Sequence, residues 1–188
     1  MLYSEASYRR RLSIEDELLA MLQEVPFDRI TVLDIAQRQN IARKTFYSYF
    51  PNKQACLEGL LDRAIYECSI RIMQESRGNQ SERQQYAGWL RFWKERQDLL
   101  GAIIRNRLEN LLVERLTAYT NQEDFFVLDH LDTELLPCDE DILHFYLSGL
   151  VAMLLKWGTE GFSRPMEEMV EKLCRLMHQP LFSYGKRK

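Results

Sequence analysis

The segment between two prolines, Pro26 and Pro51, constrains the fold of this chain most. Pro26 ends an amphipathic helix predicted for residues 7–24, because a proline lacks the backbone N–H that a continuing helix needs. Pro51 disfavours helical geometry in the residue before it. The stretch between them therefore leaves room for two short helices at most.

Local signals divide this stretch into two helices and a turn. Thr31 followed by Asp34 predicts a helix start, because the threonine oxygen can accept a hydrogen bond from an orphan N–H and the acid suits the positive helix end. We expect the first short helix to end near Gln39. Asn40 is the expected turn residue, since asparagine tolerates the left-handed conformation. A second short helix is predicted over residues 42–49.

The rest of the chain is also predicted to be helical. Only 8 glycines and 5 prolines occur in 188 residues, and strand-rich folds need more turns than that. Apolar residues recur at helical spacing in a long segment, 52–76, which predicts one long helix. The same spacing predicts two helices separated near Gln97-Asp98, further helices over 108–116 and 139–158, and a last helix that begins at Pro165. The segment 121–137 is predicted to be a loop. We expect an all-α fold, with an N-terminal three-helix helix-turn-helix domain over 1–55 and a C-terminal helical domain over 56–188.

The distribution of charge is uneven in a way that the total charge hides. A formal net charge of −3 does not indicate a nucleic-acid partner, so any positive field has to be local. From 35 to 57 the sequence has no Asp or Glu but has four cations: Arg38, Arg43, Lys44 and Lys53. From charge alone, a DNA-binding surface and a solvated cationic face are equally consistent with this window.

The residue types of the second short helix distinguish the two interpretations. It concentrates cations, hydroxyls and phenols within a few residues, and these groups suit a major groove and its flanking phosphates. Phe46 and Phe50 lie four residues apart and are expected to point inward and anchor the helix. This pattern favours DNA binding.

Cysteine and histidine form no recognisable metal or catalytic pattern. The four cysteines contain no C-x-x-C pair, and the three histidines form no H-E-x-x-H motif. No nucleophile–base pair or glycine-rich phosphate loop is visible. We therefore expect no enzymatic activity, no catalytic residues, no metal site and no cofactor, and thiols that are reduced and mostly buried.

The sequence also indicates a soluble, cytoplasmic protein without a membrane partner. No N-terminal stretch resembles a signal peptide. The most apolar run, 149–155, is much shorter than the roughly 20 residues that a membrane span needs.

The stretch from 30 to 53 resembles the signature of the TetR family of bacterial transcription regulators. The matching positions are Thr31, Ile35, Ala36, Ile41, Ala42, Thr45, Phe46, Tyr47, Tyr49, Phe50, Asn52 and Lys53. So dense a match is far more specific than a lone short motif. Two positions depart from the family's pattern: Asn40 replaces the usual turn glycine, and the region around Pro26 replaces the glycine after the first helix.

The resemblance implies which residues contact double-stranded DNA at a pseudo-palindromic operator. Base edges are expected to be read by Arg43, Lys44, Ser48 and Tyr49. Phosphates are expected to be contacted by Thr31, Thr45, Tyr47 and Lys53. Arg38 either joins the phosphate contacts or is a solvated arginine, and Tyr47 has packing as its alternative role.

The resemblance further implies that the C-terminal helices form a homodimer and enclose a pocket for a small-molecule effector. Residues 142–155 are apolar on most sides, and a helix that is apolar all round must be covered all round. The expected interface residues are Leu143, Leu147, Leu150, Leu154, Val170 and Leu173. The expected pocket residues are Trp89, Phe92, Trp93, Tyr119, Phe126 and Tyr146, although aromatic residues at helical spacing are also typical of an ordinary core.

The function expected from these features is sequence-specific transcription regulation, by a repressor that a small-molecule effector releases from DNA. The alternative is the same fold acting as a coactivator or protein-interaction module without operator recognition. One feature is left open: the acidic segment 123–141, with His130 and His144 in or near it, either binds a cation or is a solvated acidic loop.

Overall fold

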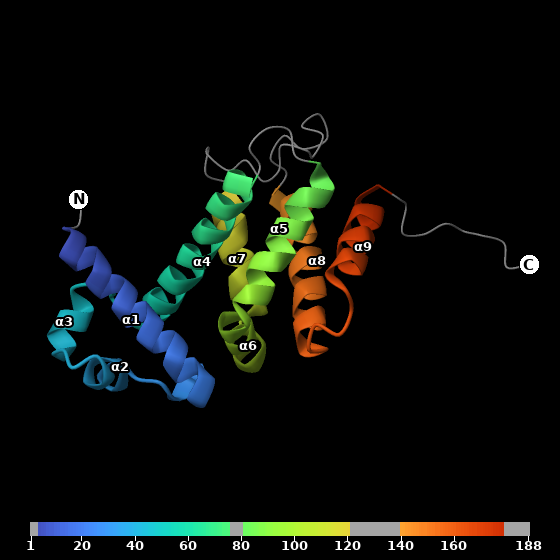
Figure 1. Ribbon diagram of the computed structural model, residues 1–188. Coiled ribbons are helices and arrows are strands. Elements are labelled where there is room, and N and C mark those ends of the chain that lie inside the picture. The colour runs from blue at the N-terminus through green and yellow to red at the C-terminus, as the bar shows by residue number, and fades with distance from the viewer. Residues whose placement is uncertain (1–3, 76–80, 121–139, 179–188) are drawn as a thin grey trace, which may run out of the picture.

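The computed structural model describes residues 4–75, 81–120 and 140–178, and within these ranges every regular element is a helix. The elements are α1 (Glu5–Glu24), the 3-10 helix η1 (Phe27–Arg29), α2 (Val32–Arg38), α3 (Arg43–Tyr47), α4 (Lys53–Glu75), α5 (Glu82–Glu95), α6 (Gln97–Asn106), α7 (Glu109–Thr120), α8 (Glu140–Thr159) and α9 (Met166–His178). Figure 1 shows α1 to α3 at one end, with α4 leading from them to the remaining helices. The predicted all-α fold is confirmed.

Most predicted helix boundaries agree with the structure to within a few residues. The second short helix is shorter than predicted: α3 covers Arg43–Tyr47 rather than 42–49, because Ala42 is extended as its N-cap and Ser48 is its C-cap. Pro165 lies just before α9, where its carbonyl accepts hydrogen bonds from the backbone N–H groups of Glu168 and Met169. The predicted loop at 121–137 lies outside the described residues.

The N-terminal helices enclose a buried apolar core. Apolar residues of α1 and α4 pack against each other, and the inward side chains of the short helices close the core between them: Ile14, Leu18, Leu22, Ile35, Phe46, Phe50, Leu57, Leu60 and Leu61. The rings of Phe46 and Phe50 lie 5.7 Å apart, centroid to centroid. Both side chains are fully buried, which confirms their predicted role as the anchors of α3.

Asn40 forms the turn between α2 and α3, as predicted. Its φ is 49°, in the left-handed region. The next residue, Ile41, donates its backbone N–H to the carbonyl of Ala36 at 2.9 Å, which closes the end of α2. The turn therefore depends on a residue that accepts a positive φ.

The C-terminal helices share one continuous core with the N-terminal ones. α4 packs against α1 and also against α5 and α7, while α8 packs against α6 and α7, and α9 against α5. Trp93 and Trp157 are both buried within this core, where the indole N–H of Trp157 donates to the carbonyl of Arg164 at 2.9 Å. The two halves are placed relative to each other by α4, which belongs to both, and by the packing of α1 against α6.

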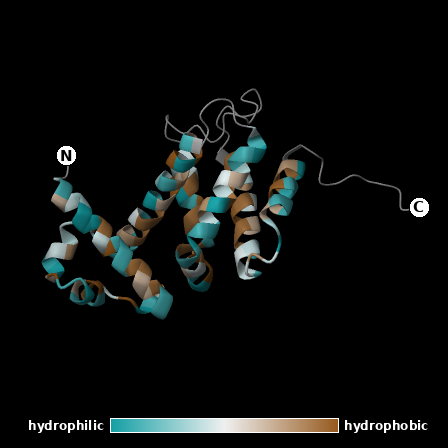
Figure 2. Ribbon diagram, viewed as in Figure 1, coloured by the Kyte–Doolittle hydropathy of each residue, from teal (hydrophilic) through white to brown (hydrophobic). Residues whose placement is uncertain are grey.

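Helix α8 is only partly covered by the rest of the chain. Figure 2 shows it brown over most of its length. Its segment Asp141–Thr159 is the one described helix whose length and apolar composition would allow a membrane crossing, a property shared by core helices of soluble proteins. One side packs on α6 and α7, whereas Ile142 and Phe145 are exposed, the latter to 76%. An apolar face of α8 is thus left uncovered.

Substitutions at Asn40 test whether the turn requires a residue that tolerates a positive φ. We expect Asn40→Val to lower the free energy of unfolding by about 1–2 kcal/mol, because a β-branched residue is disfavoured at positive φ. Asn40→Gly should leave it unchanged or raise it slightly, since glycine adopts this conformation freely. Urea unfolding of both variants measures the difference, and equal stability of the two would contradict the argument.

Candidate nucleic-acid interface

Helix α3 presents a polar face to solvent. Arg43, Lys44, Tyr47 and Ser48 are exposed, whereas Thr45 and Tyr49 are half-buried. The buried ring of Phe46 on the opposite side holds α3 against the core. The structure therefore brings most of the residues predicted to contact DNA onto one accessible surface.

Arg43 and Tyr47 support each other across one turn of α3. The Arg43 guanidinium donates a hydrogen bond to the Tyr47 hydroxyl at 3.0 Å and lies 5.5 Å from the centre of the tyrosine ring. A contact of this kind restricts the orientation of both exposed side chains. Lys44 is exposed, and in the part of the chain that the structure describes it makes no hydrogen bond or ion pair.

The remaining predicted base-contacting residues are less available. The Ser48 hydroxyl donates to the carbonyl of Thr45 at 2.6 Å, which leaves only its acceptor capacity for a partner. Tyr49 packs against the hydrophobic core with part of its surface. Arg43 and Lys44 are thus the freest polar groups of the predicted set.

Thr31 caps α2 through a reciprocal pair of hydrogen bonds with Asp34. The Asp34 backbone N–H donates to the Thr31 hydroxyl oxygen at 3.2 Å, and the Thr31 backbone N–H donates to the Asp34 carboxylate at 2.8 Å. The Thr31 hydroxyl also donates to this carboxylate at 2.7 Å, and these bonds lower the pKa of Asp34. The capping predicted from the sequence is confirmed, and the threonine hydroxyl is largely committed to it.

Lys53 has a different role in the structure from the predicted phosphate contact. Its ammonium donates to the backbone carbonyls of Phe27 and Ile30 at 2.7 Å each, and to that of Asp28 at 3.2 Å. An ammonium has three N–H donors, so all three are directed at this turn. Lys53 therefore fixes η1 in front of α2, and the phosphate contact expected for it stays a prediction.

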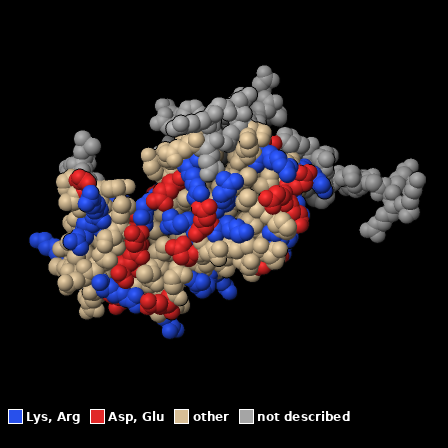
Figure 3. Space-filling model, viewed as in Figure 1, with Lys and Arg blue, Asp and Glu red and all other residues tan. Residues whose placement is uncertain are grey.

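The positive field is smaller than the acid-free sequence window suggests. Arg38 pairs with two carboxylates of α1: it is hydrogen-bonded to Glu24, and it lies 3.7 Å from Glu17. With Arg38 paired and Lys53 directed at carbonyls, only Arg43 and Lys44 of the four cations in the window are available to a ligand. Figure 3 shows red side chains beside the blue ones over much of the surface.

A buried ion pair joins α1 to α4, and the sequence analysis did not identify it. The Glu15 carboxylate is 2% exposed, lies 3.0 Å from the Arg63 guanidinium and accepts a hydrogen bond from Arg11 at 3.2 Å. Burial raises the pKa of Glu15, against the opposing effect of the two arginines. A side chain at Gly59 would come within 2.9 Å of Glu15 and Arg11. The one local signal was an acid on the apolar face of α1.

The aromatic residues predicted to line a pocket mostly belong to the core. Phe92 and Trp93 are buried, and Trp89 packs beside them. The hydroxyl of Tyr146 lies 3.0 Å from that of Tyr86, and the hydroxyl of Tyr119 lies 3.0 Å from that of Ser69. Phe126 lies outside the described residues. The prediction of an aromatic pocket is therefore replaced by the alternative of ordinary core packing for Phe92 and Trp93.

The residues of the predicted dimer interface lie mostly on faces of α8 and α9 that the chain's own core buries. One of the six residues, Leu150, is half-buried. The other five are buried within the chain's own core: Leu143, Leu147, Leu154, Val170 and Leu173. In a helix that is apolar on nearly all sides, the sequence does not distinguish the side facing its own chain from the side facing outward. The structure makes that distinction.

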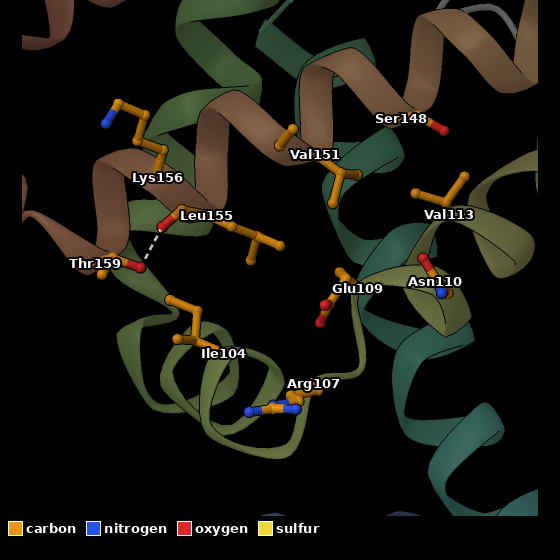
Figure 4. Close-up of a pocket in the computed structure, with 11 residues that line it drawn as sticks. Ile104, Arg107, Glu109, Asn110, Val113, Ser148, Val151, Leu155, Lys156 and Thr159 are labelled. Carbon is orange, nitrogen blue, oxygen red and sulfur yellow. Dashed lines mark hydrogen bonds between the residues drawn. The ribbon is translucent and has the colours of Figure 1, made fainter.

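A pocket of about 430 Å³ lies between α8 and the turn that joins α6 to α7. Figure 4 shows Ile104, Val151 and Leu155 pointing into this space, while Lys156 points away from it. Arg107 and Glu109 border its other side, and within the described residues neither forms an ion pair or hydrogen bond through its side chain. No pattern in the sequence indicates this pocket.

The N-terminal part of the chain is similar to a known family of proteins. Residues 14–60 match the sequence model described as bacterial regulatory proteins, tetR family. Over 63 residues the chain is 38% identical to the HTH-type transcriptional regulator EthR of Mycobacterium tuberculosis. The match covers 34% of this chain and 29% of that protein, so it spans less than a third of the relative's length.

Solved structures extend the likeness of fold to nearly the whole chain. A TetR transcriptional regulator from Streptococcus agalactiae superposes with a TM-score of 0.64 at 18% identity, covering 92% of this chain and 95% of that one. The repressor FadR of Thermus thermophilus, solved in complex with lauroyl-CoA, gives 0.55 at 18% identity, covering 95% and 98%. The expected architecture, a helix-turn-helix followed by a helical domain, is confirmed.

The two lysines of this region should respond differently to removal of their charge. We expect Lys53→Met to lower the free energy of unfolding by about 1–2 kcal/mol, because three carbonyls lose a charged donor. Lys44→Met is the matched control and should change it by less than about 0.5 kcal/mol, since its ammonium has no partner among the described residues. Urea unfolding without DNA measures both, and equal losses would exclude the positioning role of Lys53.

Proposed function

Because residues 14–60 carry the N-terminal domain of the tetR family of bacterial regulatory proteins, we propose that this chain is a DNA-binding transcription regulator. The observation that carries the proposal is the exposed polar face of α3, held outward by the buried ring of Phe46. In a helix-turn-helix, the second helix enters the major groove and its side chains reach the base edges. Helix α3 occupies that position in the chain.

We assign the contacts according to the freedom of each side chain. Arg43 and Lys44 contact base edges, where a guanidinium or ammonium can donate to O6 and N7 of guanine. Ser48 and Tyr49 lie at the edge of the same surface and make secondary contacts. Tyr47, which also orients Arg43, contacts phosphate.

Phosphate contacts also come from the helix starts. Thr45 is half-buried on the first turn of α3, and Thr31 lies at the N-terminus of α2. Backbone N–H groups at such a position attract a phosphate even where the side chain is committed to capping. These contacts position the protein on the duplex without reading sequence.

We further propose that the regulator acts as a homodimer through the uncovered face of α8. Ile142, Phe145, Gly149 and Ala152 are exposed and recur at steps of three and four residues, so they form one stripe along the helix. A Cβ built at Gly149 meets nothing within 4 Å, which leaves room for a second helix to approach closely. A two-fold axis here would present two copies of α3 to successive major grooves.

The pocket between α8 and the α6–α7 turn is the proposed effector site. Its volume of about 430 Å³ lies within the range of small-molecule pockets, and its lining is mostly apolar with Arg107 and Glu109 at its border. An effector that binds one conformation better than another shifts the population toward it. In the proposed mechanism the free dimer represses and the bound effector releases it from DNA.

The alternative function is a protein-interaction module on the same fold that does not read an operator. The exposed ammonium of Lys44 and the guanidinium of Arg43, oriented by Tyr47, favour DNA, because neither forms an ion pair among the described residues and both can reach phosphates or base edges.

Selection of preferred sequences from a random pool of duplex DNA, followed by titration at two salt concentrations, tests the proposed function. We expect a pseudo-palindrome, bound more weakly at high salt because phosphate contacts release counterions. Arg43→Ala should weaken binding by about 1–3 kcal/mol and relax the preference at the bases it contacts. Arg38→Ala is the control, since this arginine is already paired with acids of α1. Failure to enrich any sequence would favour the protein-interaction module.

A leucine at Gly149 tests the proposed dimer. Within one subunit the side chain meets open space, and leucine favours a helix over glycine by up to about 1 kcal/mol, so the subunit should fold. On the proposed interface the same side chain would hold two copies of α8 apart. Light scattering should report a dimer for the wild type and for Ala20→Leu, an exposed control position on α1, but a monomer for Gly149→Leu. A dimeric Gly149→Leu would place the interface elsewhere.

A further inference from the structure

The 3-10 turn η1, which leads from α1 into α2, is held by two elements that lie far from it in sequence. On one side, the Lys53 ammonium at the start of α4 binds the carbonyls of this turn. On the other side, the backbone N–H of Phe27 donates to the side-chain oxygen of Asn106 at 2.7 Å. Asn106 is the last residue of α6, so this bond joins the helix-turn-helix to the C-terminal helices.

Both polar atoms of the Asn106 side-chain amide form hydrogen bonds. While its oxygen accepts from Phe27, its nitrogen donates to the carbonyl of Ala102 one turn earlier in α6, at 2.8 Å. This second bond fixes the orientation of the amide and presents the oxygen to Phe27. The Phe27 N–H follows Pro26 at the start of a turn and is one of the donors that a new helix leaves unpaired. The bond therefore satisfies a backbone group that needs a partner.

Neighbouring contacts bind α6 to the end of α1 as well. The Gln23 side chain donates to the carbonyl of Asp98, at the start of α6, at 3.0 Å, and accepts from the guanidinium of Arg105, near the end of α6. Gln23 thus fixes the last turn of α1, whereas Asn106 is the residue that contacts the turn leading into α2.

The residues that follow Asn106 form the border of the pocket described above. Arg107 has a φ of 53° and ends α6 in the left-handed conformation, and Glu109 then begins α7. Arg107, Glu109 and Ile104 all line the pocket (Figure 4). The residue that contacts η1 therefore lies on the same turn as the pocket border.

We propose that Asn106 is a positioning residue for DNA recognition, which sets the placement of η1, and with it α2 and α3, relative to the C-terminal helices. Lys53 ties η1 to the start of α4, which follows α3 directly, so η1, α2 and α3 move together. A shift of the α6–α7 turn then reaches α3 through the bond between Asn106 and Phe27. This inference rests on the proposed DNA binding and adds to it the contact through which the C-terminal helices act.

The experiment compares three variants of the full chain with the wild type. Asn106→Leu removes both the acceptor and the donor at similar size. Asn106→Asp retains an acceptor for Phe27 and removes the donor to Ala102. Gln97→Leu changes an exposed residue at the start of the same helix, α6, which lies outside the pocket and makes no bond to η1 among the described residues. Each protein is measured without DNA by amide hydrogen exchange at Phe27, and with the selected operator at two salt concentrations.

The expected result is specific to the bond. For Asn106→Leu, exchange at Phe27 accelerates and operator affinity falls about five- to tenfold, the equivalent of one hydrogen bond. The salt dependence stays that of the wild type, because no phosphate contact is lost. Asn106→Asp recovers part of both the protection and the affinity, whereas Gln97→Leu matches the wild type. If Asn106 only stabilised the fold, restoring the acceptor alone in Asn106→Asp would not recover operator affinity.

Three outcomes would overturn the inference. If Asn106→Leu accelerates exchange at Phe27 but binds the operator within twofold of the wild type, the bond exists and does not position α3. If its salt dependence falls, the substitution removes contacts between cations and phosphates, and the loss of affinity is not that of one positioning bond. If the wild type binds no DNA sequence, the proposed function fails and the inference fails with it, which separates this case from the other two.

Discussion

The packing of α4 against helices on two sides is the constraint on which the rest of this structure depends. Its first turns bury Leu57, Leu60 and Leu61 against α1, and its later turns pack against α5 and α7. The ion pair between Glu15 and Arg63 adds a buried polar contact to the first of these interfaces. Arg11 is a second partner of this buried carboxylate, so that Glu15 is held by two guanidinium groups, and breaking a buried ion pair is strongly destabilising. The register of α1 on α4 is therefore well defined.

Within that frame, α3 is too short to hold its own position, and contacts from outside it supply the stability. A helix of this length has few internal hydrogen bonds, and isolated short helices are marginal in water. The buried ring of Phe46, the left-handed turn at Asn40 and the capping of α2 by Thr31 compensate for this. Because these contacts hold α3 in place, its polar side chains are left to bind a partner.

The sequence predicted the N-terminal half far better than the C-terminal half, for physical reasons. Helix starts, prolines and a positive-φ turn act locally, so Thr31, Pro26 and Asn40 could be assigned from their neighbours alone. The outward face of α8 depends on what α6 and α7 cover, and no local pattern carries that information. For this reason the sequence did not indicate that Leu143 and Leu147 turn into their own core, and the interface expected at them stays a prediction.

The sequence by itself determined that this chain is helical, that two short helices lie between Pro26 and Pro51, and which polar residues α3 offers. Only the tertiary structure decided which cations of this segment are available to a partner. Arg38 and Lys53 are cations in the sequence, but one is paired with acids of α1 and the other is bound to the carbonyls of η1. Charge is a property of a residue, whereas its availability depends on which groups the fold brings within a few ångströms of it.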